Sequence, residues 1–283
     1  MKPGIYTMPD EEYFALPEMN NSSLKDILRS PAYFKWRQET PREATKAMLT
    51  GTALHCAVLE PDEFMKRYAI LPDNAPARPT EAMLNAKKPS ESSQERVQFW
   101  EQFNIMAGGK TIISNEEAAE YLHIGTLIRT HPELSVMFDK GKAEQVIIGK
   151  DPETGIMCKC KPDYLTQVGN YKVMIELKST DDARVNAFMR TVMNFGYFQA
   201  AAFYPDVMTW AGLSRPDLYL IVAFEPNPPY GMKIYEVPQE AYEYGQRQYR
   251  KALDLYAYCL QNDEWPNYDT EITPLNLPAW VRE

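Results

Sequence analysis

Two short apolar runs joined by a tight turn set the strongest constraint on how this chain can fold. Residues 164–167 and 172–178 are rich in apolar side chains, and residues 168–170 between them form a turn signal. Because side chains of a strand alternate between its faces, Glu176 and Lys178 point the same way. Asp163 precedes the first run. The pattern predicts an antiparallel hairpin that places two carboxylates and an ammonium on one surface.

These three residue types suit the hydrolysis of a phosphodiester. A phosphate is anionic and repels hydroxide, so hydrolysis needs a hard cation, and Mg²⁺ prefers carboxylate oxygens. Asp163 and Glu176 are therefore candidate metal ligands. Lys178 could orient or deprotonate the attacking water, or stabilise charge in the transition state. The alternative is a surface strand whose acid and lysine form an ordinary ion pair.

Five stretches in register extend this pattern over most of the chain. They are Ser22-Ser23-Leu24-Lys25 with Ser30-Pro31, Gly51-Thr52-Ala53-Leu54-His55 with Leu59-Glu60-Pro61, Cys158 through Asp163, Ile175 through Thr180, and Gln199 through Tyr204. Together they resemble the PD-(D/E)xK nuclease superfamily, and specifically the RecE (exonuclease VIII) C-terminal domain of phage-type recombination systems. The resemblance implies an α/β fold with a restriction-endonuclease-like core, in which helices flank a central mixed β-sheet, and an N-terminal helical elaboration.

The resemblance also implies roles for individual residues. In the family, the histidine of the Gly-Thr-Ala-x-His motif reaches the metal, which makes His55 a candidate ligand, and the Leu177 backbone carbonyl would be another. Glu176 stands where the family usually has aspartate. From the sequence alone, His55 lies in an apolar helical pattern over residues 44–59, where a histidine is often structural.

A predicted helix over residues 185–210 carries two further candidates, Gln199 and Tyr204. The family pattern here is Gln-x-x-x-Tyr, which places an amide and a phenol on one helical face near the bound strand. This chain has one additional residue between them. Either Phe203 therefore occupies the tyrosine position, or Gln199 is rotated away from the site.

The activity implied by the resemblance is a Mg²⁺-dependent exonuclease, with Mn²⁺ able to substitute. It would degrade one strand of linear double-stranded DNA from its 5′ end and expose a 3′ overhang. The implied partners are double-stranded DNA ends, a RecT-like single-strand annealing protein, and further copies of the chain in a ring-shaped homo-oligomer. Two alternatives stay open: a structure-specific or restriction-like endonuclease, and a non-catalytic DNA-binding subunit.

Composition is consistent with a soluble enzyme. With 283 residues, 45% of them hydrophobic, the chain can bury one large core. We expect a single domain over 1–283, with residues 1–140 mainly helical and 141–283 forming the sheet core and a C-terminal helix. No apolar run reaches membrane-spanning length. The four cysteines match neither a zinc module nor an iron-sulfur motif, so we expect no iron-sulfur cluster and a cytoplasmic location.

The net charge of −9 argues against a protein that coats nucleic acid through many basic contacts. A nuclease can still concentrate its cations around the cleft. A candidate patch near the N-terminus combines basic residues with interleaved aromatic ones, and the alternative is an amphipathic helix with a solvated face. The residues concerned are Lys25, Arg29, Lys35 and Arg37 with Tyr33, Phe34 and Trp36.

Periodicity and turn signals give the remaining layout. Ser22 or Ser23 can cap a first helix that ends near Ser30. Residues 72–93 lack an apolar rhythm and are expected to form a mobile loop or DNA-facing insertion. Further helices are predicted over residues 95–106, 115–129 and 239–260, and strands over 145–149, 156–161, 164–167, 172–178, 218–224 and 232–237.

Overall fold

A five-stranded mixed β-sheet forms the centre of the computed structural model, which describes residues 1–40 and 43–276. The strand order is β10-β9-β8-β7-β4, and β8 and β9 are parallel while the other neighbours are antiparallel. The strands are β4 (Lys142–Ala143), β7 (Tyr164–Val168), β8 (Tyr171–Ser179), β9 (Leu218–Phe224) and β10 (Met232–Glu236). The predicted hairpin is confirmed as β7 and β8.

Alternating side chains of this sheet face two different hydrophobic cores. In β8, Val173, Ile175 and Leu177 join one core, whereas Met174 joins the other. Each of these four side chains is at most 2% exposed. Burying one such side chain contributes about 1.5–3 kcal/mol relative to leaving it exposed. Since a slip of one residue would exchange the two faces, burial on both sides fixes the register.

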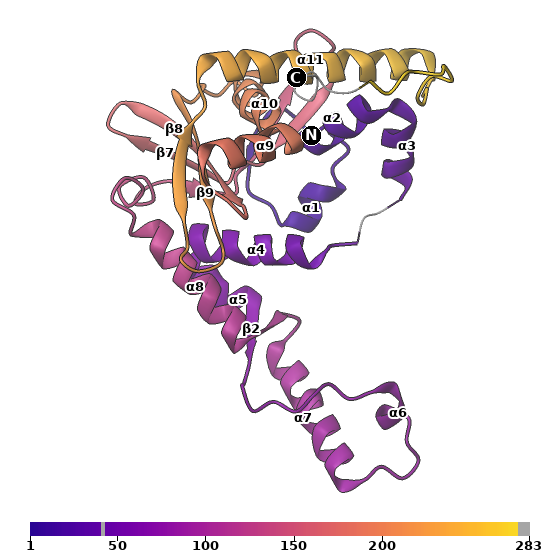
Figure 1. Ribbon diagram of the computed structural model, residues 1–283, viewed down its shortest axis with the longest axis vertical. Helices are drawn as coiled ribbons and strands as arrows, with labels where there is room; N and C mark the ends of the chain where they lie inside the picture. The colour runs from indigo at the N-terminus through magenta and orange to yellow at the C-terminus, as the bar shows by residue number, and fades with distance from the viewer. Residues whose placement is uncertain (41–42, 277–283) are drawn as a thin grey trace.

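Helices cover both faces of the sheet (Figure 1). The Val173 face packs against α4 (Lys46–Leu59), α5 (Pro61–Arg67) and α8 (Asn115–Arg129), and the Met174 face against α2 (Asn21–Arg29), α9 (Val185–Phe195), α10 (Tyr197–Trp210) and α11 (Gln239–Asn262). Helix α11 approaches α10 closely at Gly245, where an added Cβ would lie 1.9 Å from the carbonyl oxygen of Phe198. Only glycine fits this crossing.

The predicted continuous helix over residues 185–210 is wrong, because Gly196 divides it into α9 and α10. Gly196 has a φ of 64°, a left-handed conformation that costs glycine little, and its N–H bonds to carbonyls of the last turn of α9. The break allows α10 to start in a new direction at Tyr197. The sequence signal was present, since an isolated glycine in a helical pattern can mark a C-cap.

A second sheet, ordered β1-β5-β6, lies beside the first. It consists of β1 (Gly4–Tyr6), β5 (Val146–Lys150) and β6 (Met157–Cys160), and α1 (Asp10–Ala15) follows β1. Lys159 is 2% exposed and its Nζ donates to the carbonyls of Tyr13 and Leu16, at 2.7 and 2.6 Å. This lysine therefore satisfies the C-terminal end of α1 and fixes the N-terminal segment to the body. Cys158 and Cys160 are buried in the core.

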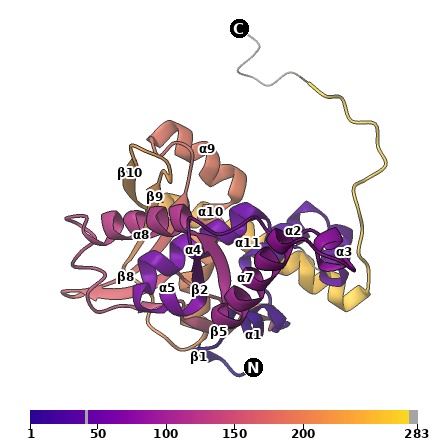
Figure 2. The same ribbon diagram turned by 90° about the horizontal axis from the view of Figure 1, so that it is seen from below.

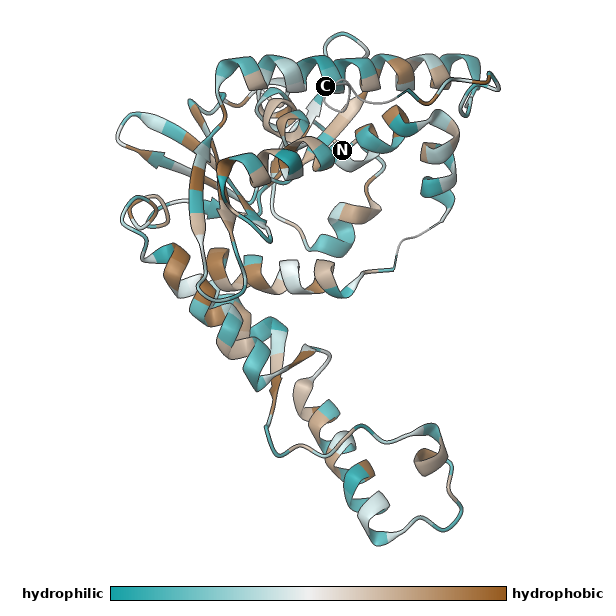
Figure 3. Cartoon of the chain, in the orientation of Figure 1, coloured by the Kyte–Doolittle hydropathy of each residue, from teal (hydrophilic) through white to brown (hydrophobic). Residues whose placement is uncertain are grey.

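An arm projects away from the sheet (Figures 1 and 2). It consists of β2 (Tyr68–Leu71), α6 (Glu81–Leu84), α7 (Glu91–Ala107) and β3 (Thr111–Ser114), with Trp100 and Phe103 in a small core of its own. Residues 72–93 were expected to form a mobile loop or a DNA-facing insertion. The expectation of a loop is wrong in part, because α6 and the start of α7 lie within this segment, and the DNA-facing insertion stays a prediction. Figure 3 shows alternating polar and apolar residues along the arm. Among the described residues, no helix is both long and apolar enough to cross a membrane.

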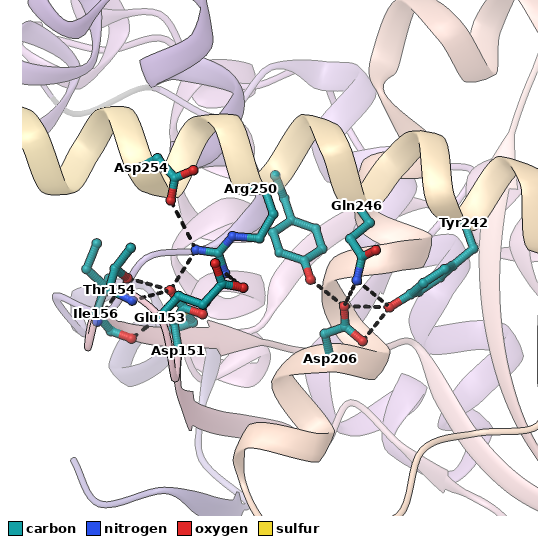
Figure 4. A network of polar contacts seen from close by, with 11 residues as sticks. Asp151, Glu153, Thr154, Ile156, Asp206, Tyr242, Gln246, Arg250 and Asp254 are labelled. Carbon is teal, nitrogen blue, oxygen red and sulfur yellow. Dashed lines mark hydrogen bonds and ion pairs between the residues drawn. The ribbon is translucent and has the colours of Figure 1, made fainter.

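Two carboxylates anchor α11 to the body (Figure 4). Asp151 accepts two hydrogen bonds from Arg250, at 2.6 and 2.8 Å. Asp206, on α10 and 7% exposed, accepts from the hydroxyls of Tyr242 and Tyr249 and pairs with Arg215 at 2.6 Å. Each buried carboxylate thus has donors that belong to the fold.

Candidate metal centre

The β7–β8 hairpin brings Asp163 next to Glu176, as predicted. Tyr164 pairs with Ile175, so Asp163 lies opposite Glu176 at the end of the hairpin ladder. The backbone N–H of Asp163 donates to Glu176 Oε1 at 3.1 Å, and the N–H of Leu177 donates to Asp163 Oδ2 at 2.7 Å. The two side chains are 7% and 3% exposed, so both carboxylates are buried at this edge.

Lys178 lies between the two carboxylates. Its Nζ is 2.8 Å from Glu176 Oε2 and 3.7 Å from Asp163 Oδ2. It also lies 5.6 Å from the centre of the Tyr197 ring, at the start of α10. The break at Gly196 therefore places an aromatic face against the lysine. Glu176 and Lys178 point the same way, as the alternation of the strand predicts.

His55 reaches the same site from α4. Its Nδ1 lies 3.5 Å from Asp163 Oδ1 and 4.0 Å from Glu144 Oε1. His55, Glu144 and Asp163 each offer a ligand atom within 4.8 Å of the others. In residues 1–40 and 43–276, this is the one group of three or more histidine, cysteine or acidic residues that could hold a cation. The prediction from the resemblance that His55 lies at the site is consistent with this geometry.

Glu144 was not identified from the sequence. It follows β4 in a left-handed conformation, with φ at 53°, and its N–H donates to the Asp163 carbonyl at 3.1 Å. Its other carboxylate oxygen pairs with Lys161 Nζ at 2.5 Å, and Lys161 also pairs with Asp10 of α1 at 2.6 Å. The only available signal was an acid just before the buried strand that starts at Val146.

Glu176 and Leu177 lie next to the three-residue group. The Glu176 carboxylate contacts Lys178 and the Asp163 backbone N–H. The N–H of Leu177 donates to Asp163, and the Leu177 side chain is buried in the core. The roles of Glu176 and of the Leu177 carbonyl as metal ligands stay predictions, and Glu144 adds a carboxylate that the sequence did not indicate.

The two buried carboxylates have opposite pKa shifts. Burial, followed by the charge of Asp163, raises the pKa of Glu176 to about 7 against the lowering effect of Lys178. Burial also favours a raised pKa for Asp163, but His55, Lys178 and the Leu177 N–H outweigh burial and hold its pKa well below the usual range. Asp163 is therefore ionised at neutral pH, whereas Glu176 titrates there.

The basic groups respond to the same charges. Burial opposes the charged form of both, yet Asp163 raises the pKa of His55, and Glu176 with Asp163 raises the pKa of Lys178. Burial, followed by the charge of Asp163, raises the pKa of Glu144. Without a bound cation, the site thus keeps Lys178 protonated and draws protons towards His55 and Glu144.

The three candidate residues on α10, Gln199, Phe203 and Tyr204, have different surroundings. Gln199 is 4% exposed and its Nε2 donates to Asn21 Oδ1 of α2 at 2.9 Å. Phe203 is fully buried against Trp210 and Tyr249 in the core. Tyr204 is partly buried, and burial together with the charge of Glu176 raises its pKa well above the usual value. Of the two aromatic candidates, Tyr204 is the one whose pKa is affected by the charge of Glu176.

The donor set fits a hard divalent cation. Two carboxylates supply the oxygen ligands that Mg²⁺ and Mn²⁺ prefer, and one imidazole makes Mn²⁺ an equally suitable occupant. Burial and then the charge of Asp163 raise the pKa of Glu144, and a bound cation would favour the ionised form of both carboxylates. The residues His55, Glu144 and Asp163 would hold the ion, with Glu176 adjacent to it.

Comparison with solved structures agrees with this architecture. A candidate exonuclease from Eubacterium rectale has 12% identity and a TM-score of 0.58, with 98% of each chain covered. At this identity the similarity supports the fold alone. SSO0001 (11% identity, 79% of this chain and 91% of that one) and VC1899 from Vibrio cholerae (12%, 86% and 57%) have TM-scores of 0.29 and 0.23, too low to support an argument.

Sequence comparison identifies the family. No curated protein matches the chain. A family model described as a PDDEXK-like domain of unknown function (DUF3799) matches residues 20–275. The mixed sheet flanked by helices is accordingly a restriction-endonuclease-like fold, of the PD-(D/E)xK nuclease superfamily. Because the match spans well over half of its length, the chain belongs to the PDDEXK-like DUF3799 family.

Proposed function

We propose that this chain is a divalent-metal-dependent deoxyribonuclease. The observation that carries the proposal is the partly buried group of His55, Glu144 and Asp163 next to the Glu176–Lys178 pair, on a PD-(D/E)xK fold. A structural ion pair needs one partner for each charge. Here three carboxylates and an imidazole converge at one end of the hairpin, which is the composition of a cation site.

Each residue of the site has a distinct task in the proposed reaction. His55, Glu144 and Asp163 would hold the cation, which when bound neutralises the phosphate and lowers the pKa of water. Lys178, kept protonated by its neighbours, would stabilise the negative charge that develops on the phosphate. Glu176, with a pKa of about 7, is matched to accept a proton from the attacking water at neutral pH. The raised pKa of Lys178 thus favours its stabilising role over deprotonation.

The finer proposal is a 5′-to-3′ exonuclease on linear double-stranded DNA that leaves 3′ overhangs for strand annealing. Its support is the resemblance of the sequence motifs to the RecE C-terminal domain, together with Asp163, Glu176 and Lys178 in those motifs. From the same resemblance we propose a RecT-like annealing protein as partner and a ring-shaped homo-oligomer. Tyr204 would lie near the bound strand.

A labelled-DNA assay tests the proposal. Linear duplex DNA carrying a label at either the 5′ or the 3′ end is incubated with the protein, with and without Mg²⁺, beside the same DNA as a closed circle. We expect metal-dependent early release of the 5′ label and an intact circle. Lys178→Ala should abolish cleavage and retain DNA binding. Cutting of the circle would indicate an endonuclease, and DNA binding without any cleavage a non-catalytic subunit.

A further inference from the structure

A small aromatic pocket lies beside α2 and α3 (Pro31–Glu39), outside the metal centre. Its volume is about 270 Å³, and its lining includes Arg29, Tyr33, Trp36 and Tyr268. Tyr268 comes from the segment that follows α11, more than 200 residues away in sequence. The pocket is therefore created by the fold, since the segment after α11 returns to the N-terminal helices.

Flat groups surround the opening. The Arg29 guanidinium lies 3.8 Å above the Tyr33 ring, and its Nε donates to the Tyr268 hydroxyl at 3.4 Å. The Tyr33 and Trp36 rings are 5.4 Å apart. Trp36 is 51% exposed and Tyr268 is 67% exposed, so both residues are accessible to solvent at the pocket. The residues described in this lining include one cation and no carboxylate.

The structure selects among the residues of the basic and aromatic patch expected from the sequence. Phe34 is buried and stacks on Trp265, so it belongs to the core. Lys35 points to Asp263, 3.8 Å away. Arg29 and Trp36 remain at the pocket. Phe34 of the patch thus belongs to the packed face of α3. Arg29 and Trp36 line the pocket together with Tyr268, which the sequence did not indicate.

A row of polar side chains connects the pocket to the metal centre. Asn21, Lys25 and Arg29 are spaced by four residues and so share one face of α2. Asn21 accepts from Gln199, near the start of α10, where Tyr197 contacts Lys178. Between Asn21 and Arg29 the helix spans about 12 Å, the length of roughly three to four stacked nucleotides at about 3.4 Å each. Gln199 and Tyr197 extend the path from Asn21 to Lys178.

We propose that this pocket binds a base of single-stranded DNA a few nucleotides from the metal centre. The inference rests on the proposed nuclease function. Aromatic rings and guanidinium planes stack on bases of any sequence, because every base has a π-face. A cavity of 270 Å³ lies just below the range of about 300–1,000 Å³ that holds drug-sized molecules, and so suits a single base. Bound there, the strand would be kept in line with the cleavage site.

The test separates base recognition from phosphate attraction. Fluorescence anisotropy in EDTA, which prevents cleavage, compares an oligothymidylate of about 20 nucleotides with an abasic oligomer of equal length and charge. We expect the wild type to bind the oligothymidylate at least about fivefold more tightly. Trp36→Ala and Tyr268→Ala should remove this preference. Arg29→Lys, which keeps the charge and loses the plane, should reduce it.

Tyr171→Ala is the matched control, because Tyr171 is 61% exposed and lies in β8, at the turn of the β7–β8 hairpin. It should leave the preference intact, and thermal unfolding confirms that all variants fold. Equal binding of both oligomers by the wild type, or a full preference in Tyr268→Ala, would overturn the inference. If the protein cleaves DNA but shows no preference for bases, the proposed function holds and the base-binding role of the pocket is overturned. If it prefers bases but does not cleave DNA, the base-binding role holds and the proposed nuclease function fails.

Discussion

Two regions of the molecule contain buried carboxylates, and the groups that surround these carboxylates differ between the regions. Asp206, on α10, accepts from the hydroxyls of Tyr242 and Tyr249 of α11 (Figure 4). It also pairs with Arg215. At the metal centre, Asp163 and Glu144 lie near each other and share one imidazole, while a third carboxylate, Glu176, shares Lys178 with Asp163. The first arrangement is complete within the fold, whereas the second places like charges close together.

The difference distinguishes structural from functional burial. A buried charge is tolerated when donors of the fold satisfy it, and a site that crowds several carboxylates together is suited to bind a cation. The opposite pKa shifts of Glu176 and Asp163 are a consequence of that crowding. Removing charge should therefore harm stability alone in the first region and activity in the second.

The largest effect is expected at Asp163. Asp163→Asn keeps the shape and an acceptor for the Leu177 N–H, but removes the charge shared by the cation group. We expect cleavage to fall by about 10³-fold or more, which corresponds to about 4 kcal/mol of transition-state stabilisation. The free energy of unfolding should fall as well, because the low pKa of Asp163 means that the folded state favours its ionised form through His55, Lys178 and the Leu177 N–H. Single-turnover cleavage and urea denaturation measure the two effects. Unreduced cleavage would remove Asp163 from the mechanism.

A loss of stability without a loss of activity is expected at Asp206. Asp206→Ala leaves the hydroxyls of Tyr242 and Tyr249 without their acceptor, and we expect the free energy of unfolding to fall by about 3 kcal/mol. The folded fraction should keep its cleavage activity. Asp254→Ala is the control, because that carboxylate is 63% exposed and contacts Arg250 at 3.3 Å, so its loss should cost less than about 1 kcal/mol. If the two variants unfold alike, the carboxylate does not anchor α11.

Cation binding should stabilise the wild type. At a concentration of Mn²⁺ about 100 times its dissociation constant, binding to the folded state alone contributes about 2.7 kcal/mol. Glu144→Gln should lose most of this stabilisation, because it removes one of the three proposed ligands. Thermal unfolding with increasing Mn²⁺ measures the effect, with Glu153→Gln, a 69% exposed acid near Arg250, as control. Equal shifts in wild type and Glu144→Gln would exclude Glu144 as a ligand.

The smallest effect concerns pH. In the metal-free protein, Glu176 has a folded pKa of about 7, above its ordinary value of 4.5. Between these values the folded state retains a proton that the unfolded state has released, so stability falls as pH rises from about 4.5 to 7. We expect a decline on the order of 2 kcal/mol from this group, which Glu176→Gln should lack. If the wild type and Glu176→Gln show the same change in the free energy of unfolding across this pH range, measured by urea denaturation, the raised pKa of Glu176 is contradicted.

The sequence predicted the hairpin and its charges because both are local. Alternation over residues 172–178 places Glu176 and Lys178 on one face whatever the remaining chain does, and the turn after β7 sets the position of Asp163. His55 required the family resemblance, since its helical pattern also fits a structural histidine. These contacts depend on few elements, which is why motif and geometry agree.

Other features depend on tertiary structure and were missed. Glu144 reaches the site because β4 pairs with β7 and because Lys161, which also pairs with Asp10, holds its carboxylate, so its role needs three separate segments. Strand β1 and helix α1 likewise gain their order from pairing with β5 and from the buried Lys159. The helix break at Gly196 follows from one residue in a left-handed conformation, which a periodic apolar pattern does not reveal.

The most direct test is the location of a bound metal. A crystal of the protein soaked in Mn²⁺ and measured at the manganese absorption edge gives an anomalous difference map of the ion. We predict a peak bonded to His55 Nδ1 and to carboxylate oxygens of Glu144 and Asp163, and loss of that peak in Asp163→Asn. An ordered peak elsewhere, or none at a concentration of Mn²⁺ that supports DNA cleavage, would contradict the account.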